Sequence, residues 1–230
     1  NVSGINKMNQ AKSVNMENLK TELIRQKELL CSIYQQNIKP NTPIYKTDFI
    51  FMGATNKALA NISAFLNLIE NENYLVAFAI VRMQLDVLLR FYAAILLDAD
   101  SRTKYSDTFL SGERIDKLQV WIKNKKGKNI KQFLTDKFLC EQFEKTFGVD
   151  WVLRVYQQTS KFIHMSGISF LCMINKTENK GKDIKFRIGL HKDGKIQIEN
   201  EHLVDSISCI IDITQHILAC LDIWLKEKET

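Results

Sequence analysis

The stretch YLVAFAIVRMQLDVLLRFYAAILL, from Tyr74 to Leu97, decides the fold, because it is long and almost entirely apolar. Its length would allow it to span a bilayer. However, Arg82, Asp86 and Arg90 stand near its middle, and each charge at the centre of a membrane helix costs about 2.5–3.5 kcal/mol. The stretch is therefore predicted to be the core helix of a bundle, and we expect no membrane partner.

Helical character extends to both sides of this stretch. The chain has only two prolines, Pro40 and Pro43, and none follows them, which favours helices joined by glycine and asparagine turns. An apolar period near 3.6 recurs at about 50–69, 151–163 and 203–225. We predict that these segments pack with 74–97 as one bundle.

The two prolines also suggest how the domain is organised. Ahead of them, residues about 16–37 carry spaced apolar residues among polar ones, which predicts an amphipathic helix that packs on the body or on a partner: Leu19, Leu23, Leu30 and Ile33. We expect residues 1–43 to form a helical arm with a proline linker, and residues 44–230 to form the bundle domain. The predicted fold class is all-α, with about five to seven helices.

One segment has the alternation of a β-hairpin. In DIKFRIGLHKDGKIQIEN apolar residues alternate on both sides of Asp193-Gly194, which predicts a small hairpin near 184–199, just before the C-terminal helix. We expect strands nowhere else. The basic run KNKKGKN, from Lys123 to Asn129, is interpreted as a loop between shorter helices, which is either a solvated surface or a phosphate-contact patch.

Composition excludes several classes of protein. An apolar fraction of 45% with 25% charged residues excludes disordered and fibrous chains. The net charge of +6 permits an acidic partner such as RNA without requiring one. The five cysteines lie far apart and form no C-x-x-C pair, so we expect neither disulfides nor a metal site, and a cytoplasmic location. The common nucleotide-binding signatures are absent, and we expect no cofactor.

Polar residues at four-residue intervals are the candidate site. Tyr156, Ser160 and His164 would form one stripe on a helix, with Lys161 beside it and Ser166 just after it. The stripe is either a buried hydrogen-bond network or a site in which Ser160 orients His164 as a general base. On the core helix, Arg82, Asp86 and Arg90 have the same spacing, which suits an ion-pair ladder or an anion clamp formed by Arg82.

The two segments AFAIVRMQLDVLLRFYAAILL and VYQQTSKFIHMSG together resemble uncharacterised bacterial helical proteins of the HEPN-like kind. Those proteins show an R-x-x-x-E/D helix followed by a Y-x-x-x-S-x-x-x-H-x-S segment, and the match covers roughly residues 70–170. The resemblance implies a bundle of four or more helices, a homodimer as in many such proteins, and a role in toxin, abortive-infection or RNA-processing systems. An operon-encoded protein partner is a further expectation. By position, the motif residues are Arg82, Asp86, Tyr156, Ser160, His164 and Ser166.

The sequence also departs from that family. Active HEPN ribonucleases are similar in having an Arg separated from the His by four to six residues, but positions 157–159 hold Gln157, Gln158 and Thr159. One hypothesis is an RNA- or nucleotide-associated defence or toxin-type protein, which in its catalytic form is a degenerate metal-independent ribonuclease. Its catalytic residues would be His164, Arg82 and Ser160, supported by Asp86, Arg90, Tyr156, Lys161 and Ser166. The alternative is a non-catalytic helical binding or scaffold module. Both hypotheses predict that Arg82 and Asp86 face the helix that carries His164.

Overall fold

The computed structural model describes the backbone of residues 2–37, 44–123, 127–163, 174–180, 183–188 and 200–229. Side chains are described for 16–36, 44–122, 127–163 and 201–227. The described part contains seven α-helices, one 3-10 helix and two small antiparallel hairpins. This confirms the predicted all-α fold class, with a small hairpin before the C-terminal helix.

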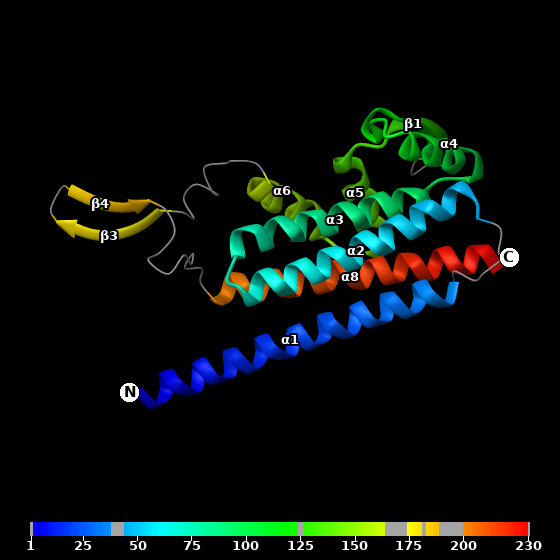
Figure 1. Cartoon of the computed structure of the whole chain (residues 1–230). Coiled ribbons are helices and arrows are strands. Elements are labelled where there is room, and N and C mark those ends of the chain that lie inside the picture. The colour runs from blue at the N-terminus through cyan, green and yellow to red at the C-terminus, as the bar shows by residue number, and fades with distance from the viewer. Residues whose placement is uncertain are drawn as a thin grey trace.

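Four long helices form the body of the molecule (Figure 1): α1 (Val2–Asn37), α2 (Lys46–Glu70), α3 (Tyr74–Leu96) and α8 (Asn200–Glu229). As predicted, α3 is a core helix, with fourteen of its residues buried. The helix α1 begins at Val2, well before the predicted start near residue 16. It packs on α8 and α2 through Leu23 and Leu30, which are fully buried. Burial of one such leucine contributes about 1.5–3 kcal/mol, so the arm belongs to the bundle.

One helix among the described residues, Glu201–Glu227 within α8, has the length and mean hydropathy of a membrane span. The stretch 74–97, which most resembles a membrane span in the sequence, is not such a helix. Half of the apolar window in α8 is buried inside the molecule, and Ile210, Ile213 and Ile217 are fully buried. This is the burial expected of a helix that closes a protein core.

Shorter elements cover one side and one end of this body: α4 (Ala99–Leu110), the 3-10 helix η1 (Ile115–Lys117), β1 (Gln119–Lys123), β2 (Asn129–Phe133), α5 (Asp136–Phe147) and α6 (Val152–Ile163). The helix α6 packs on α3 and α5. In Figure 1 the β1–β2 hairpin lies beside α4 at the end of the bundle where the C-terminus lies.

The β1–β2 hairpin corrects the prediction that strands occur only near 184–199. Val120 is buried, and Leu134 directly after β2 donates a backbone hydrogen bond of 3.2 Å to the carbonyl of Leu118. Gly127, in the turn region, has a φ of 73°, a left-handed conformation that glycine adopts without strain. The lysine-rich run obscures this hairpin in the sequence, because its charge pattern is typical of a loop and the alternation of Val120 and Ile122 is short.

The second hairpin pairs differently from the prediction. The strand predicted from residue 184 is present as β4 (Asp183–Ile188), but its partner is the preceding β3 (Ile174–Lys180). Only two residues separate β3 from β4 in the sequence, which is the commonest hairpin spacing. The predicted turn at Asp193-Gly194 and the predicted return strand, residues 196–198, lie outside the described residues.

Candidate functional site

The candidate site lies where α3 meets α5 and α6. The side chain of Arg82 forms an ion pair with Asp86, and its Nε donates to Ser160 Oγ at 3.3 Å. Its guanidinium carbon lies 4.0 Å from the centre of the Tyr156 ring, which is a cation–π distance. The prediction that Arg82 faces the helix of the polar stripe is therefore confirmed, and only 5% of Arg82 is exposed.

Asp136, which the sequence analysis missed, connects the three helices. It is the first residue of α5, and Tyr156 donates its hydroxyl to Asp136 Oδ2 at 2.8 Å. Arg90 forms an ion pair with the same carboxylate, and Arg82 Nη2 lies 3.7 Å from Oδ2. Arg90 thus pairs with α5 and does not simply extend the ladder along α3. We call this group the Arg82 cluster: Arg82, Asp86, Arg90, Asp136, Tyr156 and Ser160.

The charges of the Arg82 cluster balance, with two guanidinium groups and two carboxylates. Burial raises the pKa of Asp86, although the hydrogen bond and the charge of Arg82 act in the opposite direction. Burial opposes the charge of Arg82, but the hydrogen bond and charge of Asp86 outweigh it and raise the pKa of Arg82. Burial and the hydrogen bond to Asp136 raise the pKa of Tyr156. Tyr156 therefore remains a protonated donor at neutral pH.

Ser160 is fully engaged inside the cluster. Its Oγ donates to the carbonyl of Tyr156 at 2.6 Å and accepts from Arg82 Nε. With its only proton directed back along α6, Ser160 cannot also donate to a histidine ring in this arrangement. Lys161 is exposed on α6, whereas His164 and Ser166 lie outside the described residues. Five of the eight candidate residues thus lie together in the Arg82 cluster: Arg82, Asp86, Arg90, Tyr156 and Ser160.

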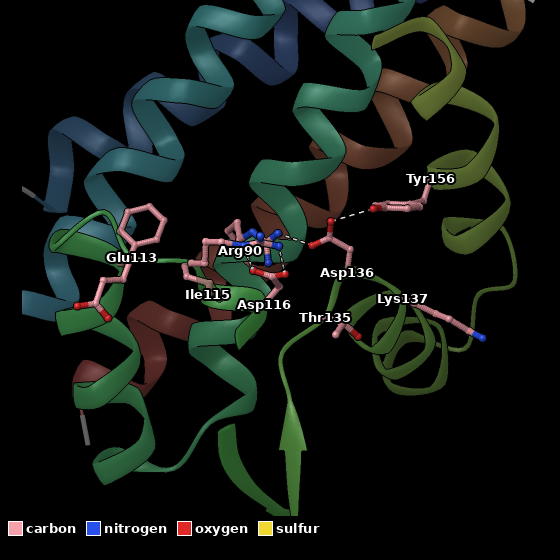
Figure 2. A pocket seen from close by; sticks show the side chains of 10 residues that line it. Arg90, Glu113, Ile115, Asp116, Thr135, Asp136, Lys137 and Tyr156 are labelled. Carbon is pink, nitrogen blue, oxygen red and sulfur yellow. Dashed lines mark hydrogen bonds and ion pairs between the residues drawn. The ribbon is translucent and has the colours of Figure 1, made fainter. Parts of the chain in front are cut away.

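An open pocket of about 600 Å³ lies beside the cluster. Figure 2 shows Arg90, Asp136 and Tyr156 along its wall, joined by the interactions described above. Its charged lining holds three cations and three carboxylates: Arg90, Arg114, Lys137, Glu113, Asp116 and Asp136. Arg114 is itself paired with Asp116. This balance gives the pocket no preference for an anion.

A second polar network, which the sequence analysis also missed, lies in the core. Asn61 Nδ2 donates to Gln84 Oε1 at 3.1 Å, and Gln84 Nε2 donates to Thr214 Oγ1 at 3.1 Å. All three residues are at most 2% exposed, and they connect α2, α3 and α8. This network is neutral and closed to solvent, so its role is to fix how the helices pack.

The histidines, cysteines and carboxylates of the described part of the chain are the residues that could bind a metal ion or, for the cysteines, act as a thiol nucleophile. No group of three or more His, Cys, Asp or Glu residues there is arranged to hold a metal ion. Burial raises the pKa of both Cys140 and Cys220 to about 12, which keeps these thiols protonated. Neither cysteine therefore has the thiolate character that a nucleophile requires.

Comparison with protein-family models, with curated proteins and with solved structures finds no match to this chain. The resemblance to HEPN-like proteins stays a prediction. The functional assignment therefore rests on the geometry of the residues described above.

Proposed function

We propose that this chain is an RNA-associated, HEPN-like protein of the defence or toxin type whose motif residues hold the bundle together and do not cleave RNA. The observation that carries this proposal is that Arg82 is buried and already paired inside the protein. A metal-independent ribonuclease needs a cation that reaches the phosphate and stabilises the charge of the transition state. Arg82 is buried, and its donors are directed to Asp86 and Ser160.

The sequence around the stripe supports the same conclusion. Positions 157–159, where active HEPN ribonucleases would carry an arginine, hold two glutamines and a threonine. Arg90 is the other cation of the cluster, and Asp136 already binds it. Arg82 can bind a substrate phosphate only if its ion pair with Asp86, one turn along α3, is broken. Arg90 can do so only if its ion pair with Asp136 on α5 is broken.

Association with RNA is supported by two features of the chain. The motif residues occur in the order and at the spacing of the HEPN-like segments, and the net charge is +6. A net positive charge favours a polyanionic partner through the release of its counterions. The alternative, a scaffold module without RNA, predicts the same contacts in the Arg82 cluster but no affinity for RNA.

The proposal includes a homodimer in a reducing cytoplasm. Ile24 and Leu29 on α1 are 44% and 40% exposed, so this helix presents apolar surface that a second copy could cover. Four cysteines among the described residues are free, and Cys31 is exposed, which suits a reducing compartment. Sedimentation equilibrium of the purified protein would test the dimer directly.

The test of the proposal is an RNA-binding and RNA-cleavage assay without metal. Purified protein is incubated in EDTA with an unstructured single-stranded RNA, alongside His164→Ala and, as a control on the same helix, Lys161→Ala. We expect the RNA to be bound and to remain intact in all three samples. Cleavage by the wild type that is lost in a folded His164→Ala variant would overturn the structural role of the stripe. Absence of RNA binding by the wild type would favour the scaffold alternative.

A further inference from the structure

The positive charge of this chain is concentrated in one small element. Residues 119–133, a range that includes both strands of the β1–β2 hairpin, contain five lysines and no acidic residue, whereas the whole chain has a net charge of +6. The rest of the molecule is therefore almost neutral. Five positive charges within fifteen residues create a local positive potential that the net charge of the whole chain does not reveal.

The strand register places aromatic and basic side chains on one face of the hairpin. Trp121 lies directly opposite Lys131, and Gln119 lies opposite Phe133, so the two aromatic residues are diagonal neighbours. Trp121 is 52% exposed and Phe133 is 45% exposed. The Lys131 ammonium lies 5.3 Å from the centre of the Trp121 ring. We call these residues the hairpin face: Gln119, Trp121, Lys131 and Phe133.

The exposure of these rings does not come from a detached hairpin. On the opposite face Val120 is 3% exposed, and Leu118 and Leu134 at the two ends of the hairpin are buried in the core. The hairpin is thus anchored by one face while the other presents two aromatic rings to solvent. Exposed large aromatic residues beside lysines are typical of surfaces that stack nucleic-acid bases.

Three residues of the hairpin face, Gln119, Trp121 and Lys131, also line a groove, together with the neighbouring Val120. The groove has a volume of about 300 Å³, and its other wall is the first part of α4, with Asp100, Ser101 and Lys104. Lys104 and Lys131 stand on opposite walls, and Trp121 lies beside Lys131. The first turn of α4 is already capped by Asp98, which accepts from the Ser101 N–H at 2.8 Å. The groove therefore offers side chains, and not a free helix end, to a ligand.

We propose that this groove and the hairpin face bind single-stranded RNA. Bases stack on Trp121 and Phe133, and the lysines of both walls contact phosphates. The proposal rests on the RNA association proposed above and names its surface and the form of the RNA. A single strand is required because the bases of an A-form duplex are stacked inside and cannot reach the two rings.

Asp100, which lines the groove, favours RNA over DNA as the ligand. A carboxylate repels phosphate, so it would weaken binding of any nucleic acid if it met only the backbone. It can, however, accept a hydrogen bond from a ribose 2′-hydroxyl, which DNA lacks. We expect Asp100→Ala, which removes this acceptor, to reduce the ratio of RNA affinity to DNA affinity.

The proposal is tested by fluorescence anisotropy with a labelled, unstructured single-stranded RNA and the full chain at fixed low salt. Trp121→Ala should weaken binding about 5- to 150-fold, the loss that corresponds to removal of one stacked base. Phe49→Ala and Lys57→Gln are matched controls, because both side chains are exposed on α2 outside the hairpin, and they should leave the affinity unchanged. Circular dichroism should show that all the variants are folded.

The outcomes distinguish this proposal from the function on which it rests. Wild-type affinity in Trp121→Ala would overturn the hairpin face as the binding surface but leave the RNA association intact. No RNA binding by the wild type would overturn both. Equal affinity for single-stranded DNA of the same sequence, or for poly-glutamate, would overturn the assignment to RNA. Weaker RNA binding by Trp121→Ala, with unchanged affinity in both controls and a preference for RNA over DNA, would support the proposal.

Discussion

The Arg82 cluster and the hairpin face both contain cationic side chains next to aromatic rings, but the two regions differ in how their charge is balanced. In the cluster Arg82 lies against the ring of Tyr156, and Asp86 and Asp136 neutralise the two arginines. On the hairpin Lys131 lies near the ring of Trp121, in a segment that has no acidic residue. Arg82 is only 5% exposed, whereas Trp121 is 52% exposed.

This difference separates a structural role from a binding role. A buried charge must have a partner inside the protein, because burial without one costs several kcal/mol, on the order of the whole stability of a domain. An exposed charge can remain unbalanced, since water solvates it until a ligand arrives. The same residue types therefore stabilise the fold in one region and are available to a polyanion in the other.

The largest effect is expected when the Arg82 cluster is broken. Arg82→Ala leaves Asp86 and Asp136 without their shared cation and removes the contact with Tyr156. We expect a loss of about 3 kcal/mol, at the low end for a broken buried ion pair because Asp86 is still partly exposed. Urea unfolding measures this loss. The control Arg154→Ala, an exposed arginine on α6, should change stability by at most about 0.5 kcal/mol. An equal effect of the two substitutions would mean that the cluster is not structural.

A smaller loss is expected in the neutral core network. Thr214→Val keeps the shape of the side chain but leaves the Gln84 amide without its acceptor. The cost should be about 1–3 kcal/mol, the range for a buried donor that loses its partner. Thr103→Val, an exposed threonine on α4, is the control and should be nearly neutral. A cost for Thr214→Val above that of Arg82→Ala would contradict our ranking of the two networks.

Cys140 provides a local reporter of the cluster. It is fully buried on α5, close enough to Arg82 and Asp136 for their charges to influence its thiol, and its pKa is raised to about 12 by burial. We expect a thiol reagent at neutral pH to modify exposed Cys31 in the native protein and to leave Cys140 unmodified. In Arg82→Ala, Cys140 should react faster, while Cys220 on α8 should stay protected; peptide mass spectrometry identifies the modified sites. Unchanged protection of Cys140 would show that α5 does not depend on the cluster.

The smallest effect should come from one lysine of the hairpin face. Lys131→Gln should not change stability measurably, because the side chain is exposed. It should reduce the slope of log affinity for single-stranded RNA against log salt concentration by about 0.7, the value for one lost phosphate contact. The measurement is a series of RNA titrations at increasing salt. An unchanged slope would remove Lys131 from the set of phosphate contacts.

The sequence allowed the bundle to be predicted more fully than the site. The core helix α3 and its neighbours α2 and α8 lie close to their predicted positions, because the apolar period is a local signal that burial reinforces. The ion pair between Arg82 and Asp86 was also predictable, since its partners are one turn apart. Asp136 was not, because its partners Arg90 and Tyr156 lie 46 and 20 residues away, and only the tertiary fold brings them together.

The hairpin face was missed for a different reason. The alternation of β1 and β2 is short, and the lysines between them match the composition of a surface loop. Sequence alone left the basic run as either a solvated loop or a phosphate-contact patch. The strand register favours the second interpretation, because it places Trp121, Lys131 and Phe133 on one face of the hairpin. Val120 on the other face is buried and anchors the hairpin.

The division between a structural cluster and a binding hairpin is tested most directly by following backbone amide signals during titration with single-stranded RNA. Heteronuclear NMR of the uniformly labelled chain reports both regions in one experiment. We predict that the shifts occur in β1, β2 and the first turn of α4, and that the signals of Arg82, Asp136 and Tyr156 stay in place. Shifts centred on the Arg82 cluster, with the hairpin unchanged, would contradict the account.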